Sequence, residues 1–194
     1  MNRDRVVDVV VEIPRGSRNK YEMDKEKGVI RLDRRLFSAT FYPTDYGYIP
    51  ETLGEDGDPL DALVILDEPT FPGCVIGCRP VGVFWMEDDA GPDAKIICVV
   101  EGDPRWEHVQ DIGDLPEHLT QEIEHFFTIY KQLEPGKWAD TRGFQGVAEA
   151  RAEIAQFFEV YKMLEPGKHS NTRGFEGTGP AWDEIDEAFA RYPG

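Results

Sequence analysis

The sequence predicts an α+β protein in which a β-barrel comes first and helices pack on its side. Between residues 6 and 100, short runs of β-branched and aromatic residues are separated by Gly, Pro and Asp, a pattern typical of barrels built from short strands. Beyond residue 118, apolar residues recur every three or four positions, which is the period of an α-helix. Strands followed by helices indicate the α+β arrangement.

The expected strands lie in six apolar runs. In chain order these are VVDVVVEI, KYEMD, VIRLD, ALVIL, VIGCRPVGVFWM and KIICVV. The second and third runs form a pair around Glu26-Lys27-Gly28, because such residues are typical of turns.

Two helices are expected after the strands. The first begins near His118 and ends before Pro135-Gly136, since Pro and Gly stop helices. One face of it carries Leu119, Ile123, Phe126, Tyr130 and Leu133. The second helix is predicted over residues 149–164. The expected units are a barrel domain with the first helix at residues 1–147, and a C-terminal helix with a duplicated tail at residues 148–194.

The tail contains an internal repeat. FFTIYKQLEPGKWADTRGFQG, which begins at Phe126, returns as FFEVYKMLEPGKHSNTRGFEG from Phe157, an offset of 31 residues. Two copies are too few for a solenoid, whose units need neighbours on both sides. The repeat therefore indicates a duplicated segment.

Charge and cysteine content restrict the classes of function. The chain has 38 Asp and Glu against 21 Lys and Arg, a net charge of −17, which disfavours nucleic acid and anionic membranes as partners. Its three cysteines are an odd number without histidines at zinc spacing, so buried thiols in the cytoplasm are expected. The N-terminal residues show neither a signal peptide nor a membrane span.

The densest chemical signal is the segment EDGDPLD at residues 55–61. Asp56, Asp58 and Asp61 lie beside a Gly and a Pro that favour a turn. A calcium loop of the EF-hand type needs Gly at its sixth position, but counting from Asp56 that position holds Asp61. The open alternatives are a cation site and an Asp-rich surface turn.

A second acidic segment, DDAGPDAK at residues 88–95, lies between two apolar runs and predicts a hairpin. Asp88 and Asp93 are expected to face each other across its mouth. If strand ends meet at one rim of the barrel, up to five aspartates converge there and form a magnesium site with several ions. An ordinary polar hairpin loop is the alternative.

Cationic and phenolic side chains complete the candidate site. Lys20, Arg34, Lys95 and Lys131 are suitable donors to phosphate oxygens, although each alone is also explained as a solvated surface charge. Tyr130 lies on the apolar face of its helix, so core packing explains it equally well. Metal ions together with basic groups indicate a phosphoryl substrate.

These segments resemble the soluble family I inorganic pyrophosphatases of bacterial type. The string DGDPLD at residues 56–61 matches that family's D-G-D-P-x-D signature. The similarity continues through EIP at 12–14, KYE at 20–22, DR at 33–34, FYP at 41–43, YGY at 46–48, RPVGV at 79–83, residues 88–95, HFF at 125–127 and YK at 130–131. It extends from about residue 9 to residue 154.

The resemblance implies a five-stranded, OB-like barrel, a cytoplasmic homohexamer and magnesium-dependent hydrolysis of pyrophosphate to two phosphates. In that reading a magnesium-activated hydroxide attacks phosphorus with Asp58 as general base, and Tyr46 tunes the base. The implied metal ligands are Asp56, Asp61, Asp88, Asp93 and Glu12, with several ions per site. The implied substrate-binding residues are Lys20, Arg34, Lys95, Tyr130 and Lys131, supported by Glu22 and Tyr42.

The chain departs from the family pattern after Lys131, because a second YKMLEPGK block and a predicted helix containing Trp182 follow. We assign the substrate role to Tyr130 and Lys131, and a structural role to Tyr161 and Lys162. Two other functions stay open at this point. One is oligonucleotide binding by an OB-like barrel, which the net charge disfavours, and the other is a catalytically silent relative.

Overall fold

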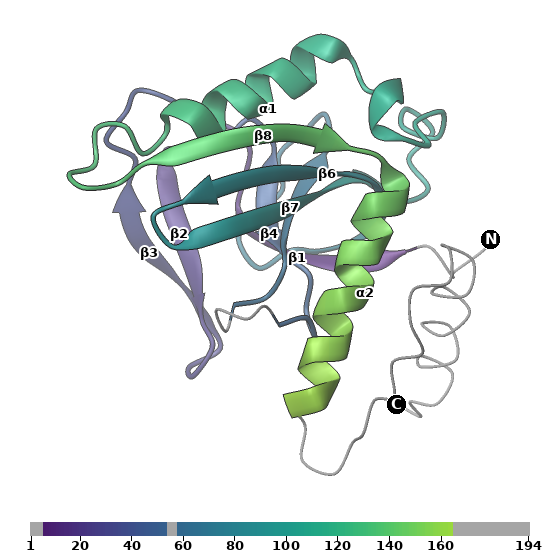
Figure 1. Cartoon of the computed structure of the whole chain (residues 1–194), viewed down its shortest axis with the longest axis horizontal. Helices are drawn as coiled ribbons and strands as arrows, with labels where there is room; N and C mark the ends of the chain where they lie inside the picture. Colours follow the sequence, from purple (N-terminus) through teal and green to yellow (C-terminus); the bar gives the residue numbers. More distant parts are fainter. Residues whose placement is uncertain (1–5, 54–57, 165–194) are drawn as a thin grey trace.

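The computed structural model describes residues 6–53 and 58–164 and builds them around one curled sheet (Figure 1). Its strands are β1 (Val7–Ile13), β4 (Asp45–Tyr48), β5 (Asp61–Ile65), β6 (Val75–Asp88), β7 (Gly91–Val100) and β8 (Ala139–Gln145). Neighbours follow the order β1-β4-β5-β7-β6-β8, and β1 also pairs with β6. Five strands therefore close into a ring, which confirms the predicted barrel, and β8 extends the sheet beyond β6.

A separate antiparallel hairpin consists of β2 (Asn19–Asp24) and β3 (Val29–Arg35). Its turn ends at Gly28, whose φ of 63° is readily adopted by glycine because no Cβ opposes it. The predicted pairing of these two runs is confirmed. Lys20 lies opposite Arg34 in the ladder, so the hairpin brings two of the predicted phosphate donors together.

The long strand β6 pairs with β7 along one edge and with two strands, β1 and β8, along the other. Its first residues, 75–78, pair with β1, and its last residues, 83–88, pair with β8. Between them lies Pro80, which has no N–H for a ladder, and the pairing with β7 is irregular between Pro80 and Gly82. A Cβ at Gly82 would lie 2.8 Å from the carbonyl oxygen of Gln145, so only glycine permits this close approach.

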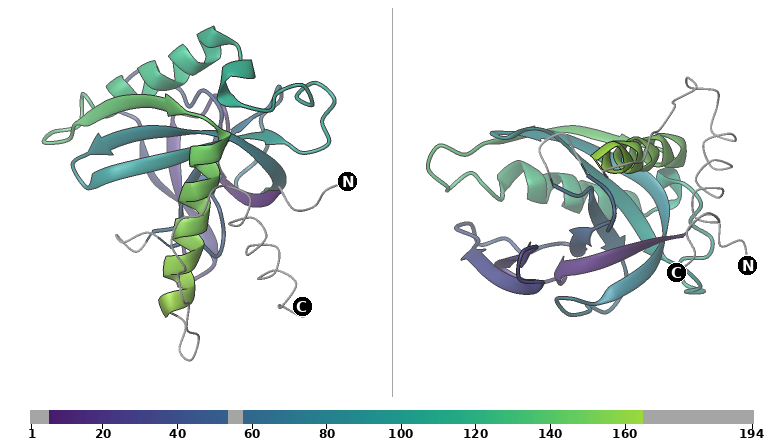
Figure 2. Two further views of the ribbon diagram at one scale, coloured as in Figure 1. Left: turned by 45° about the vertical axis from the view of Figure 1, so that its right-hand side comes forward. Right: turned by 90° about the horizontal axis from the view of Figure 1, so that it is seen from below.

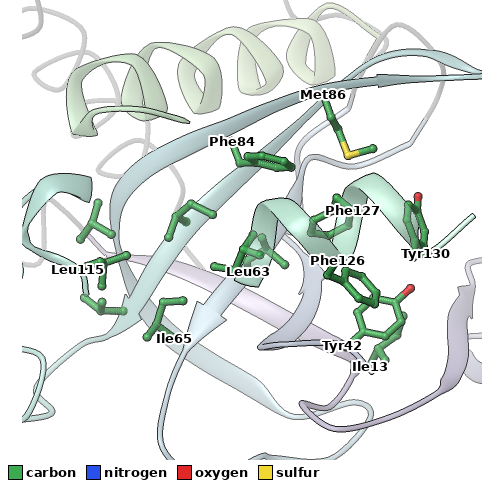
Figure 3. Close-up of a cluster of buried hydrophobic side chains, with 14 of the residues drawn as sticks. Ile13, Tyr42, Leu63, Ile65, Phe84, Met86, Leu115, Phe126, Phe127 and Tyr130 are labelled. Atoms are coloured by element: carbon green, nitrogen blue, oxygen red, sulfur yellow. The ribbon is translucent and has the colours of Figure 1, made fainter. Parts of the chain in front are cut away.

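Strand β5 is buried on both faces. Leu63 and Ile65 belong to a core cluster that includes residues of helix α1 (Glu117–Ile129), as Figure 3 shows for one part of it. Ala62 and Val64 belong to a second cluster that includes residues of helix α2 (Val147–Leu164). This double burial explains why ALVIL is a continuous apolar run and not an alternating one.

The two helices lie on different sides of the barrel (Figure 2). Before α1 comes a short 3-10 helix, η2 (Ile112–Asp114), and Asp111 at its start accepts a hydrogen bond of 3.0 Å from the N–H of Val147. A carboxylate at this place stabilises the N-terminus of α2. The predicted second helix, residues 149–164, is confirmed with a start two residues earlier.

Three sequence expectations on secondary structure are corrected. Helix α1 ends at Ile129, and turns follow over residues 130–136, so Leu133 leaves the buried face and is 63% exposed. The short strand β4 was not predicted. Strand β8, which lies between the two helices in the sequence, was not predicted either. Its composition does not favour a strand, but the free edge of β6 offers it hydrogen-bond partners.

Two further findings concern the described residues as a whole. None of the helices within residues 6–53 and 58–164 is long and apolar enough to cross a membrane. The three cysteines, Cys74, Cys78 and Cys98, are free thiols, and the last two are buried.

Candidate active site

Lys95 is the centre of the site and is only 1% exposed. Strands β5 and β7 run parallel with Asp61 in register with Lys95, which places the two side chains together. The Lys95 Nζ lies 2.8 Å from Asp61 Oδ2 and 2.9 Å from both carboxylate oxygens of Asp93. Burial alone would lower the pKa of Lys95, but the charges of Asp61 and Asp93 outweigh it and raise the pKa above its ordinary value. The ammonium therefore stays charged at neutral pH.

Tyr46 joins this cluster from β4. Its hydroxyl donates a hydrogen bond to Asp61 Oδ2, and the same hydroxyl oxygen lies 3.3 Å from Lys95 Nζ. Burial and the charges of Asp61 and Asp93 raise the pKa of Tyr46, so the phenol stays protonated and remains a donor. The ring of Tyr42 packs edge-on against it at a centroid distance of 5.5 Å.

Asp88 and Asp93 lie near the turn between β6 and β7, which confirms the predicted hairpin but not their register. Asp88 is opposite Gly91, and Asp93 is opposite Met86. The turn takes only two residues, so the residue opposite Asp88 lies two positions earlier in β7 than expected. Burial raises the pKa of Asp93, while Lys95 opposes the effect.

A second ion pair connects this hairpin to the end of α1. Lys131 Nζ donates to Asp88 Oδ2 at 2.5 Å and lies 3.6 Å from Asp89 Oδ1. Tyr130, which precedes it, is buried, and its ring stacks on Phe126 at 5.3 Å (Figure 3). Tyr130 thus serves as core residue and as a neighbour of the charged groups, which were alternatives at the sequence level.

The β2–β3 hairpin carries the third group of charges. Lys20 pairs with Glu22 and lies 3.7 Å from Asp33. Arg34 makes two contacts of 3.1 Å with the buried carboxylate of Glu134, one from Nε and one from Nη2. Glu134 was not predicted from the sequence. The signal that could have found it is its place three residues after Lys131, in the turn that ends α1.

Glu12 lies at the end of β1 and accepts a hydrogen bond of 2.7 Å from the N–H of Met23. Its pKa is raised to about 7, mainly because the carboxylate is buried, with the N–H of Met23 opposing and the charge of Asp61 contributing to the rise.

The remaining predicted residues come from the acidic turn. Asp58 exposes 76% of its side chain and pairs with Lys25 Nζ at 2.9 Å, at the tip of the β2–β3 hairpin. Asp56 lies outside the described residues, as do all positions of the second repeat from residue 165 onward.

The acidic side chains of the site are of the type that binds magnesium. Within the described parts of the chain, no three acidic, His or Cys side chains already converge as a closed metal site. Magnesium commonly binds through only one or two carboxylates and completes its shell with waters and substrate phosphates. Asp61 and Asp93, which meet at Lys95, offer hard oxygen donors of this kind, so these two residues fit magnesium.

Comparison with known proteins identifies the family. A family model described as inorganic pyrophosphatase matches residues 9–156. The chain belongs to the inorganic pyrophosphatase family. A relative named inorganic pyrophosphatase from Streptomyces coelicolor is 62% identical over 146 residues, which cover 75% of this chain and 90% of the relative.

Solved structures of inorganic pyrophosphatases support the same assignment. The structure from Thermus thermophilus superposes with a TM-score of 0.80 at 52% identity and covers 81% of this chain and 92% of its own. The structure from Helicobacter pylori gives 0.79 at 43% identity, with 81% and 94% covered. The pyrophosphatase match includes every predicted site residue from Glu12 to Lys131 and ends one residue before the second copy of the repeat.

Proposed function

We propose that this chain hydrolyses inorganic pyrophosphate to two phosphates, with magnesium as cofactor, at the cluster around Lys95. Its membership of the family, with relatives named inorganic pyrophosphatase at 55–62% identity, supports the reaction. The observation that carries the location is the buried ammonium of Lys95, held by Asp61, Asp93 and Tyr46 on three adjacent strands.

The proposed metal ligands are Asp56, Asp61, Asp88, Asp93 and Glu12. Bound magnesium neutralises phosphate charge and lowers the pKa of water, so that a nucleophile forms near neutral pH. In this proposal, Lys95 and Tyr46 hold the carboxylate of Asp61 at one position, and Asp93 is held by the same ammonium. Burial raises the pKa of Glu12, so a neighbouring cation would stabilise the charged form of this carboxylate.

The proposed substrate-binding groups are Lys20, Arg34, Lys95, Lys131 and Tyr130. Three of the cations have acidic partners that keep them in place: Asp33 beside Lys20, Glu134 beside Arg34, and Asp88 beside Lys131. These groups come from the hairpin, from β7 and from the turns after α1, and in this proposal they contact the phosphates from different elements. Planar and point-charge donors of this kind stabilise charge on the transferred phosphoryl group and on the leaving phosphate.

Asp58 is proposed as the general base, with Glu22 and Tyr42 in supporting places. Its exposed carboxylate is accessible to water, and its partner Lys25 is exposed as well. Asp58→Asn is expected to lower turnover by about 10²- to 10⁴-fold and to leave the free energy of unfolding unchanged. A variant with normal turnover would exclude Asp58 as the base.

The proposal includes a cytoplasmic homohexamer without nucleic-acid or membrane partners. Free thiols are consistent with a reducing compartment. Large exposed apolar side chains, among them Phe37, Phe41 and Phe71, offer surface that contacts between subunits would cover. Light scattering on the eluted peak of a size-exclusion column measures the assembly, and a mass of one chain would exclude the hexamer.

The activity is tested by phosphate release from pyrophosphate during a magnesium titration, with EDTA as control. Rapid release that depends on magnesium is expected. Absence of release by folded protein would favour the catalytically silent relative. A salt-sensitive affinity for a single-stranded oligonucleotide would instead favour the binding module.

A further inference from the structure

The internal repeat is not explained by pyrophosphate hydrolysis. Copy 1 comprises residues 126–146 and copy 2 comprises residues 157–177, and 14 of the 21 aligned positions are identical. The structure describes all of copy 1. Copy 1 can therefore be used to ask which of its side chains matter to the fold and whether copy 2 retains them.

The buried residues of copy 1 are all retained. Phe126, Phe127, Tyr130 and Glu134 are the buried positions of the segment, and copy 2 has the same residues at 157, 158, 161 and 165. In copy 1 these rings pack on one another and on the barrel, with Phe127 at 5.5 Å from Phe84. A core position of this kind tolerates few other side chains.

The ion pairs and backbone requirements of copy 1 are retained as well. Lys131 reaches Asp88, Lys137 reaches Asp89, and Arg142 reaches Glu87, all on β6 or its turn. Copy 2 has Lys162, Lys168 and Arg173 at the equivalent positions. Gly136 and Gly143 of copy 1 have φ of 77° and 82°, and copy 2 has glycine at both places.

The seven differences between the copies fall where the structure is tolerant. Five of them are exposed in copy 1 and none is buried; in copy 1 the seven positions are Thr128, Ile129, Gln132, Trp138, Ala139, Asp140 and Gln145. Gln145 accepts a hydrogen bond of 2.6 Å from Trp85 Nε1, and the glutamate at this place in copy 2 can accept it too. Unconstrained divergence would have reached buried positions as often as exposed ones.

The correspondence continues beyond the repeat at the same offset of 31 residues. Ala150 and Ile154 of α2 are buried against the barrel, and the sequence has Ala181 and Ile185 at the equivalent places. Pro180 corresponds to Glu149, in the first turn of α2, where proline is compatible with a helix.

Residues 157–164 of copy 2 belong to α2 in this structure, with Phe157 and Phe158 packed against the second core cluster. We propose that copy 2 is nevertheless a functional substitute for copy 1: in a chain without residues 126–156, its sequence can complete the barrel, with Tyr161 and Lys162 taking the roles of Tyr130 and Lys131. Residues 178–192 then correspond to the beginning of α2. The chain thus carries one barrel and two segments that can complete it. The structural part of this inference is independent of the proposed function, whereas the roles of Tyr161 and Lys162 rest on it.

The decisive variant deletes residues 126–156, which joins His125 to Phe157 in register and leaves copy 2 as the sole copy. Its matched control deletes residues 157–187 and leaves copy 1. Cooperative unfolding and phosphate release within about threefold of the control are expected. Lys162→Ala in the first deletion is expected to lose as much turnover as Lys131→Ala in the second.

A third variant keeps the full chain and introduces into copy 1 the seven residues of copy 2. These are Thr128→Glu, Ile129→Val, Gln132→Met, Trp138→His, Ala139→Ser, Asp140→Asn and Gln145→Glu. Folding and turnover close to those of the unmodified chain are expected. Loss of folding or activity in this variant, or in the 126–156 deletion while its control is active, would overturn the proposal. Inactivity of the unmodified chain and of the folded control would instead count against the pyrophosphatase function.

Discussion

Two lysine–aspartate contacts in this molecule have similar distances and different surroundings. Lys95 lies 2.8 Å from Asp61 with 2% of its side chain exposed, and Lys25 lies 2.9 Å from Asp58 with 52% exposed. Lys95 also contacts Asp93 and Tyr46, and its ammonium lies 5.3 Å from the ring centroid of Phe127. Water screens the pair at Lys25.

The contrast shows that the N–O distance alone does not indicate how much an ion pair contributes to the stability of the fold. At Lys95 strands β4, β5 and β7 meet, so removal of the ammonium leaves two partly buried carboxylates close together without their shared partner. At Lys25 either partner can be hydrated when the other is lost. We therefore expect loss of the Lys95–Asp61 contact to affect both the fold and the site, and loss of the Lys25–Asp58 contact to affect only its immediate surroundings.

Lys95→Met is expected to have the largest effect. The variant loses about 3–5 kcal/mol of unfolding free energy, because the partly buried carboxylates of Asp61 and Asp93 remain close together without their shared partner. Turnover is expected to fall by about 10³-fold, since the proposed donor to the phosphate is lost as well. Urea denaturation and phosphate release measure the two effects. A variant as stable as the parent would show that the three charges are not coupled.

Asp61→Ala is expected to have the next largest effect. It removes a proposed metal ligand and the acceptor of both Lys95 and Tyr46, so turnover is expected to fall by at least about 10²-fold. The assay is phosphate release across a magnesium titration. Near-normal activity at limiting magnesium would contradict a shared metal ligand at this position.

Lys131→Ala is expected to reduce turnover by about 10- to 100-fold, because the proposed charge-assisted contact to phosphate and the ion pair with Asp88 are lost. Lys162→Ala in the full chain is the matched control, and less than about threefold loss is expected. Equal losses in the two variants would show that Lys131 was wrongly chosen between the copies.

Lys25→Ala is expected to have the smallest effect. The free energy of unfolding changes by less than about 0.5 kcal/mol, since the pair with Asp58 is exposed. Thermal and urea unfolding measure it. A loss comparable to that of Lys95→Met would remove the distinction between the buried and the exposed pair.

The ring strands other than β4 and the positions of both helices could be predicted because their residues form apolar runs or follow a periodic apolar pattern. Strand β8 could not be predicted, because Ala139–Gln145 contains few residues that favour strands and pairs only where β6 leaves an edge. The end of α1 was placed too late for a related reason. Tyr130 and Leu133 follow the apolar period, but Lys131 and Glu134 form their ion pairs from a turn.

The residues of the candidate site could be listed from the sequence motifs, whereas their contacts with one another required the structure. The sequence by itself determined the barrel with helices, the aspartate-rich segments and the repeat, because these depend on local patterns and on residue type. It also supplied the division at residue 147, which stays a prediction.

Only the tertiary structure decided that Lys95 is held between Asp61 and Asp93, that Arg34 binds Glu134, and that the register at Asp88 differs from the expected one. These contacts depend on strand register and on residues far apart in the chain. Local sequence patterns do not specify them.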